Sequence, residues 1–187
     1  MAAPSRLGVR QGSLFGVLDP AIDTSFADVE RIRLDDRSWI DVARGWLSGS
    51  DAVFDELVHL LPLRQRTDVK MFDRLVDEPR LSAWWHDDGG LPEPMPILAE
   101  MRELLSDRYG ERFHSIGFNL YRDGADSVAW HGDRHRHIVT DPIVAIVSVG
   151  CPRPLRLRPS GAAAGPCWIS TFPTSLFADR EVLVCAR

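Results

Sequence analysis

The feature that most constrains the fold is a change of hydrophobic period near residue 114. Before it, apolar residues recur at helical spacing over 39–47, 53–61 and 97–105. Pro62 and Gly110 are placed to end the second and third of these runs, and a proline at 96 suits a helix start. We therefore predict three helices in the first half of the chain.

After residue 114 the pattern is typical of strands. Short strands are predicted over 115–121 and 127–130, joined by the turn 122–126. The run 143–149 is rich in β-branched residues and is expected to be a strand buried on both faces. A further strand is expected at 181–185. Helices followed by strands predict an α+β or mainly β domain.

Length and composition favour one domain and place few limits on partners. The chain has 187 residues and a formal net charge of −5, which excludes a uniformly basic surface but leaves room for a local basic groove. No apolar run reaches the length of a membrane span, so no membrane association is expected. Three cysteines in no metal-binding spacing argue against a disulfide framework. We expect a cytoplasmic protein, and the oligomeric state is left open.

The densest polar cluster runs from His131 to His137 and includes Asp133. His131 and Asp133 are two apart, so on an extended segment both side chains point to one side and can meet one divalent ion. Two histidines and a carboxylate form the facial triad of non-haem Fe(II) oxygenases. By itself the pattern is weak, since about 0.6 such pairs are expected by chance. A second pair, at His86 and Asp88, precedes two glycines and is predicted to be a solvated loop; a cupin-like metal hydrolase that uses both pairs is a further alternative.

Three segments in order make the pattern more specific. They are an Asn-x-Tyr strand with a glycine turn (118–124), the segment that carries His-x-Asp (126–133), and an apolar strand that ends Ser-x-Gly (143–150). Together they resemble the AlkB family of Fe(II)- and 2-oxoglutarate-dependent dioxygenases, over roughly residues 74–158. The resemblance implies a double-stranded β-helix (jelly roll) buttressed by N-terminal helices, with its last strands missing. It implies one domain with a helical part and substrate-facing cover (1–112), a β-helix core (113–158) and an atypical tail (159–187).

The resemblance also implies a reaction and a set of site residues. Members oxidise the N-alkyl carbon of alkylated nucleic acid bases, with O2 as co-substrate and release of formaldehyde, succinate and CO2, which repairs alkylation damage directly. The cofactors would be Fe(II) and 2-oxoglutarate, and the partner alkylated DNA or RNA. The implied residues are His131 and Asp133 as catalytic metal ligands, Asn119 and Tyr121 for 2-oxoglutarate, and Phe72, Trp84 and Arg134 for the substrate.

The chain departs from the family at two positions. The family's third iron ligand is a later histidine, and no histidine follows His137 here. The distal arginine that pairs with 2-oxoglutarate also has no counterpart, since Arg180 and Arg187 alone follow Arg158. We therefore expect either a chain that stops before these strands or a rearranged tail from about residue 160. The alternative function is a catalytically inactive remnant or a binding module.

Overall fold

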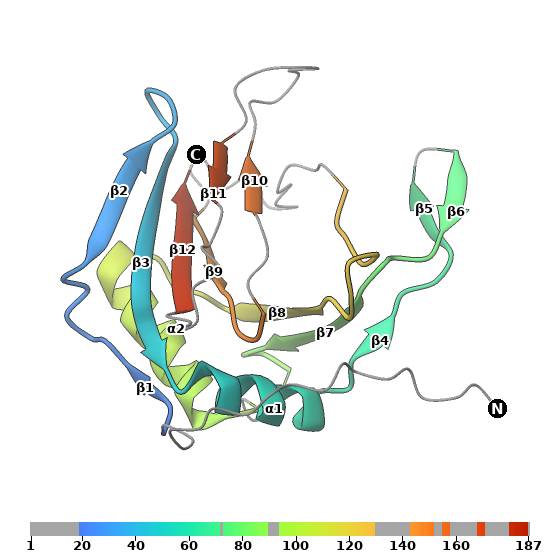
Figure 1. Cartoon of the computed structure of the whole chain (residues 1–187), viewed down its shortest axis with the longest axis horizontal. Coiled ribbons are helices and arrows are strands. Elements are labelled where there is room, and N and C mark those ends of the chain that lie inside the picture. The colour runs from blue at the N-terminus through green and yellow to red at the C-terminus, as the bar shows by residue number, and fades with distance from the viewer. Residues whose placement is uncertain are drawn as a thin grey trace.

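A computed structural model of the chain gives the arrangement of its secondary structure (Figure 1). The residues it describes are 19–71, 73–89, 94–129, 143–151, 155–157, 168–170 and 180–186. They form, in chain order, β1 (Ala21–Ile22), β2 (Val29–Arg33), β3 (Trp39–Ser48), α1 (Ser50–Leu60), β4 (Arg64–Gln65), β5 (Val69–Met71), β6 (Arg74–Val76), β7 (Leu81–His86), α2 (Pro96–Tyr109), β8 (Ser115–Leu120), β9 (Ile143–Val147), β10 (Leu155–Leu157), β11 (Trp168–Ser170) and β12 (Arg180–Ala186).

The largest sheet is antiparallel and brings the two ends of the described chain together. Its order is β1-β3-β12-β9, with β2 also paired to β3 (Figure 1). β12 lies between β3 and β9, with Val184 opposite Asp41 on one side and Ala145 on the other. Smaller antiparallel sheets are β4-β7-β8, β10-β11 and β5-β6. The fold is β-rich, as the sequence predicted.

The prediction of a helix over 39–47 is wrong, because this segment is the long strand β3. Gly45 has a φ of 68°, and the pairing with β12 shifts register there, which marks a bulge. The bulge offsets the alternation of side chains, so that apolar residues on either side of it fall at spacings that mimic a helix. β3 also pairs on both edges and is buried on both faces, which removes the polar alternation of a surface strand.

The two faces of β3 meet different parts of the core. Ala43, Trp46 and Leu47 pack with apolar residues of α1 and α2. Ile40 and Val42 belong to a second cluster, against which Leu155 and Leu157 of β10 pack. The helices therefore cover one face of the large sheet, and the β10-β11 pair lies over the other.

A buried carboxylate links this sheet to α2. Asp41 on β3 is 2% exposed and accepts two hydrogen bonds from Arg31, at 2.6 and 2.7 Å. The Tyr109 hydroxyl donates a third at 3.0 Å, and the Tyr109 ring stacks on Trp39. Burial raises the pKa of Tyr109 above its ordinary value, so this group stays a proton donor toward Asp41. Hydrogen bonding to Asp41 raises the pKa of Arg31 in turn.

The other helix predictions are confirmed. α1 covers 50–60 and ends before Pro62. α2 has a proline in its first turn, buries Leu98, Met101 and Leu105 on one side, and ends at Gly110 with a φ of 68°. The glycine adopts a left-handed conformation that other residues rarely take.

Predictions for the strands are mixed. β8, β9 and β12 and the turn at 122–126 are confirmed. The strand predicted at 127–130 is not formed over 127–129, where the Ser127 amide bonds to the Pro79 carbonyl instead of a ladder partner. The expectation that 143–149 is buried on both faces is also wrong. Among the described strands, β9 is the last in the order of the large sheet, and its Ile146 side chain is 36% exposed.

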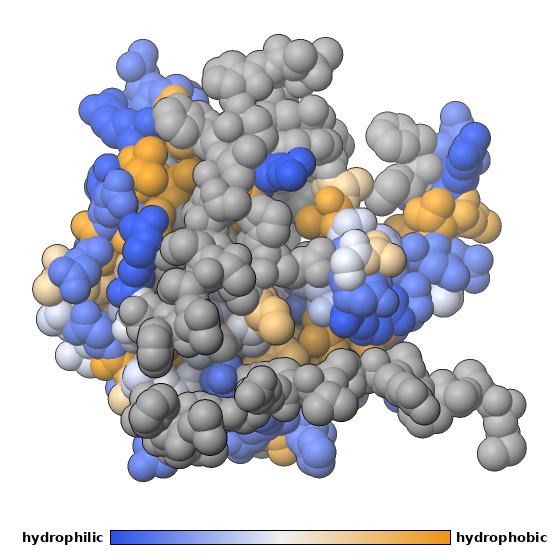
Figure 2. Space-filling model, viewed as in Figure 1, coloured by the Kyte–Doolittle hydropathy of each residue, from blue (hydrophilic) through white to orange (hydrophobic). Residues whose placement is uncertain are grey.

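The β5-β6 hairpin stands away from the body of the molecule in Figure 1. Figure 2 shows hydrophobic residues at its base and hydrophilic residues toward its tip. Leu75 on β6 is 65% exposed, so the hairpin presents apolar surface to solvent. Within the described residues, neither helix is long and apolar enough to cross a bilayer.

Gly150 follows β9 and contacts α1, and its replacement is expected to destabilise the fold. Its φ is 82°, and a Cβ there would lie 2.9 Å from Cδ2 of Phe54. We expect Gly150→Ala to lower the free energy of unfolding by about 2 kcal/mol through strain and overpacking. Gly110→Ala, with the same left-handed conformation but nothing within 4 Å of its Cβ, is expected to cost only about 1 kcal/mol. Urea unfolding of both variants checks this, and equal losses would contradict the packing contribution.

Candidate functional site

The candidate site is built on the antiparallel pair β7-β8. Ser82 lies opposite Asn119 and Trp84 opposite Gly117, so these residues share one face of the pair. The other face carries Ala83 and Trp85, both 8% exposed. One face therefore packs on the protein, and the polar face remains open.

Trp84 is held on that open face although it is 65% exposed. Its indole lies over Gly117, where an added Cβ would come within 3.0 Å of the indole Cη2. His86 stacks beside it, with ring centroids 6.0 Å apart and planes at 11°. The glycine allows the ring to lie close to the strand, and an exposed flat ring suits stacking with another planar group.

Asn119 lies on the same face of the ladder as Trp84, and Tyr121 comes two residues later, directly after the end of β8. Asn119 is exposed and lies inside the ladder. Tyr121 is half-buried and follows the last ladder pair, Leu81 with Leu120. Its place therefore depends on the turn that follows β8 as well as on the ladder.

That turn closes around a buried carboxylate. Asp126 is 4% exposed and accepts hydrogen bonds at 2.8 Å from the Arg122 backbone N–H, Nε and Nη2. The Asp123 carboxylate accepts from the backbone of Ala125 and Asp126. Hydrogen bonding to Asp126 raises the pKa of the Arg122 guanidinium, which therefore remains charged.

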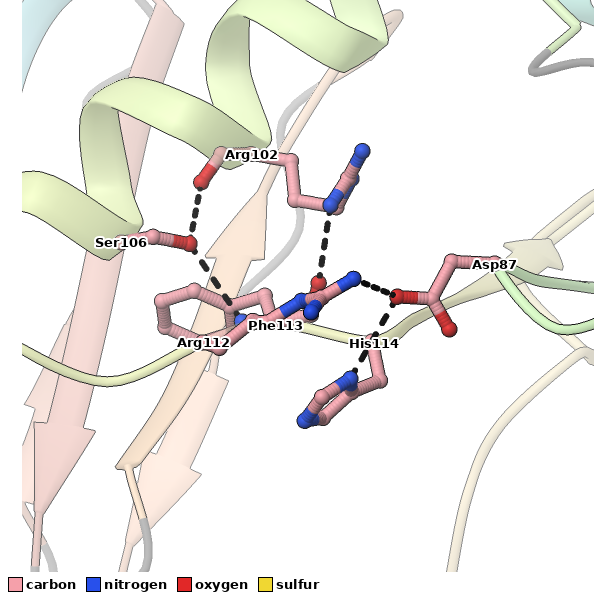
Figure 3. A network of polar contacts seen from close by, with 6 residues as sticks. All are labelled: Asp87, Arg102, Ser106, Arg112, Phe113 and His114. Carbon is pink, nitrogen blue, oxygen red and sulfur yellow. Dashed lines mark hydrogen bonds and ion pairs between the residues drawn. The ribbon is translucent and has the colours of Figure 1, made fainter.

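The start of β8 is fixed by the end of α2 (Figure 3). The Ser106 hydroxyl donates to the Arg102 carbonyl at 2.7 Å and accepts from the Phe113 N–H at 3.3 Å. Arg102 Nη1 donates to the Phe113 carbonyl at 3.4 Å, and the Arg102 guanidinium lies 5.4 Å from the Trp85 ring centroid. These contacts hold the loop that leads into β8.

A charged cluster lies beside this loop, at the end of the β7-β8 pair (Figure 3). Arg112 donates to Asp87 at 2.9 Å, and His114 Nδ1 lies 3.4 Å from the same oxygen. Partial burial acts to raise the pKa of Asp87, but the hydrogen bonds from His114 and Arg112 act to lower it and together outweigh burial. The pKa of Asp87 is therefore below its ordinary value. Asp87 therefore remains ionised and paired.

The structure describes three of the predicted site residues. Asn119 and Trp84 share one face of the β7-β8 pair, and Tyr121 follows directly after the end of β8. The other four lie outside the described residues, so their placement remains a prediction: His131, Asp133, Phe72 and Arg134. Among the described residues no three metal-binding side chains form a group that would hold an ion, so the iron site rests on the sequence pattern.

Two features of the site differ from sequence expectations. His86 ends strand β7 and stacks on Trp84, whereas a solvated loop was expected there; the turn begins only at Asp87. The ion pair between Arg122 and the buried Asp126 was not anticipated from the sequence, which predicted only a turn there. An acid four residues after an arginine across a glycine turn is the signal that would have suggested it.

Comparison with known proteins indicates what class of site this is. No protein-family profile matches the chain. Curated relatives do match, and several of them are named as alpha-ketoglutarate-dependent dioxygenases of the AlkB type, which confirms the resemblance. Among them is the alpha-ketoglutarate-dependent dioxygenase alkB homolog 3: the chain is 34% identical to the Bos taurus protein over 124 residues and 32% identical to the Homo sapiens protein over 121. It is 31% identical to the Homo sapiens DNA oxidative demethylase ALKBH2 over 100 residues.

The matches cover part of each protein. They include 60% of this chain and 42% of the Bos taurus relative, and 58% and 41% with the Homo sapiens alkB homolog 3. For ALKBH2 the shares are 48% and 38%. The chain is thus related to the AlkB-like dioxygenases but spans about two fifths of these relatives.

Proposed function

We propose that the chain carries the site of an Fe(II)- and 2-oxoglutarate-dependent oxidative dealkylase of alkylated nucleic acid bases, on a double-stranded β-helix. The observation that carries this proposal is the shared face of Asn119 and Trp84, with Tyr121 directly after the strand, in a chain similar to such dioxygenases. The proposed reaction consumes O2 and 2-oxoglutarate and releases succinate, CO2 and formaldehyde. When bound, the iron and 2-oxoglutarate supply the oxidation of the N-alkyl carbon.

Each residue has a role within this proposal. His131 and Asp133 offer an imidazole nitrogen and a carboxylate oxygen, a donor set that suits ferrous iron. Asn119 and Tyr121 present an amide and a hydroxyl, which can hydrogen-bond the carboxylates of 2-oxoglutarate. Phe72 and Arg134 are proposed to meet the nucleic acid, the arginine through a phosphate.

Trp84 is proposed to stack on a base of the substrate. Its support is the exposed indole fixed between Gly117 and His86 on the same side as Asn119. Stacking of bases on aromatic side chains tolerates any sequence, because every base has a π face. This contact would therefore give affinity for nucleic acid without selecting a sequence.

We expect Trp84→Ala to weaken binding of an N-methylated single-stranded oligonucleotide roughly tenfold, the magnitude of one lost base stack. Fluorescence anisotropy with a labelled oligonucleotide measures the change. Leu60→Ala removes a comparably exposed apolar residue at the end of α1 and is expected to leave binding unchanged. A loss of equal size in both variants would indicate that Trp84 has no specific part in binding.

The reaction itself is tested by incubating the full chain with Fe(II), 2-oxoglutarate and the methylated oligonucleotide in air. Formaldehyde and succinate released in equal amounts would support the proposed function. The alternative, an inactive binding module, is favoured by the lack of a histidine after His137. It predicts no succinate and a melting temperature that metal and 2-oxoglutarate do not change.

A further inference from the structure

We propose that Asp126 is a positioning residue for 2-oxoglutarate, which acts by fixing Tyr121; this rests on the proposed function. The starting point is the burial of its charge. Asp126 is 4% exposed, whereas the neighbouring residues 123–125 and 127–129 are exposed. A buried carboxylate in a surface turn is costly unless its oxygens are well satisfied.

The partners of Asp126 are concentrated on the residue next to Tyr121. Arg122 donates to it through its main chain and through both Nε and Nη2, all at 2.8 Å. Two side-chain bonds fix the guanidinium in its plane, and the third fixes the backbone directly after Tyr121. The carboxylate therefore constrains the main chain of that neighbour.

A backbone hydrogen bond also connects this turn to the segment that leads into β7. Ser127, next to Asp126, donates its backbone N–H to the Pro79 carbonyl at 2.9 Å, just before β7 begins. The β7-β8 ladder ends at the pair of Leu81 and Leu120. Tyr121 thus lies between the end of the ladder and a turn that Asp126 closes, whereas Asn119 lies within the ladder.

Because Tyr121 depends on the turn and Asn119 does not, loss of Asp126 should affect 2-oxoglutarate binding through Tyr121 alone. A role of Asp126 in stability alone does not predict this. Asp126→Asn would place an amide N–H group against the N–H donors of Arg122 and so open the turn. We expect the Kd of 2-oxoglutarate, measured by anaerobic calorimetry on the Fe(II)-loaded full chain, to rise about tenfold. In a Tyr121→Phe background the same change should raise the Kd less than about twofold, and in an Asn119→Ala background the tenfold rise should persist.

Two controls separate positioning from loss of stability. Gly150→Ala destabilises the fold far along the chain from the turn and is expected to leave the Kd unchanged. Arg122→Lys retains the charge but loses the planar pair of donors, and we expect it to raise the Kd of 2-oxoglutarate about threefold. It replaces Asp126→Asn in the test if that variant does not fold. Lysine stays protonated at neutral pH, so Arg122→Lys adds no pH-dependent charge to the turn.

The outcomes distinguish this inference from the proposed function. Unchanged 2-oxoglutarate affinity in both Asp126→Asn and Arg122→Lys, with binding intact in the unmodified chain, overturns the positioning role alone. An equal rise in the Tyr121→Phe background also overturns it, because the effect would then not pass through Tyr121. Absence of 2-oxoglutarate binding by the unmodified chain overturns both proposals.

Discussion

His131→Ala is expected to lower Fe(II)- and 2-oxoglutarate-dependent succinate formation by at least about a hundredfold. The proposed site has few protein ligands for iron, and loss of a group that only supports a ligand already costs about 10- to 100-fold. Loss of a ligand should cost at least the upper value. Succinate released by the purified full chain in air measures the effect.

The matched control for this variant is His59→Ala. His59 lies in the last turn of α1, is exposed, and belongs to no His-x-Asp pair. We expect it to retain the activity of the unmodified chain. Equal activity of the His131→Ala and unmodified chains would remove His131 from the iron site, and with it the principal support for the metal chemistry.

Asp41→Asn is expected to have the largest effect on stability, a loss of about 2–3 kcal/mol in the free energy of unfolding. The carboxylate is 2% exposed and accepts hydrogen bonds from Arg31 and Tyr109. In Asp41→Asn, the side-chain NH2 group would replace one accepting oxygen and would lie against these donors. The loss should be smaller than for a wholly buried pair, because the Arg31 side chain is 53% exposed and keeps access to water. Urea unfolding measures it.

An exposed ion pair on the same two strands provides the comparison. Arg44 donates to Glu30 at 3.0 Å, and the two side chains are 50% and 59% exposed. Glu30→Gln is expected to cost less than about 0.5 kcal/mol, since solvent screens the pair. Similar losses for Asp41→Asn and Glu30→Gln would show that burial of Asp41 adds nothing to its contribution.

Sequence reasoning succeeded where local signals decide the structure. The proline before α2 and the glycine after it mark that helix without reference to the rest of the chain. The β-branched run of β9 and the glycine turn after β8 are local signals of the same kind. Each depends on backbone preferences within a few residues.

It failed where tertiary packing determines the pattern. β3 is buried on both faces and contains a bulge at Gly45, so its apolar residues do not alternate. Its neighbour β12 lies more than about 130 residues further along the chain. Pairing between segments so far apart leaves no local signal in the sequence. His86 was misread for a related reason, since its strand is completed by pairing with β8.

The candidate site was predictable in part. The spacing of Asn119 and Tyr121 indicated a shared side, and the structure places Trp84 on the face of Asn119 through its register with Gly117. The spacing of Arg122 and Asp126 suggests a pair across the turn, but it does not show that Asp126 is buried, because the same spacing also occurs in exposed turns. The placement of His131 and Asp133 remains a prediction from the sequence.

The most direct test is whether the chain binds 2-oxoglutarate through the β7-β8 face. Anaerobic calorimetry of the Fe(II)-loaded full chain, and of its Asn119→Ala variant, measures this before any turnover occurs. The proposed function predicts saturable binding that weakens at least about tenfold in the variant. Binding that is absent, or that is equally tight in Asn119→Ala, would contradict it.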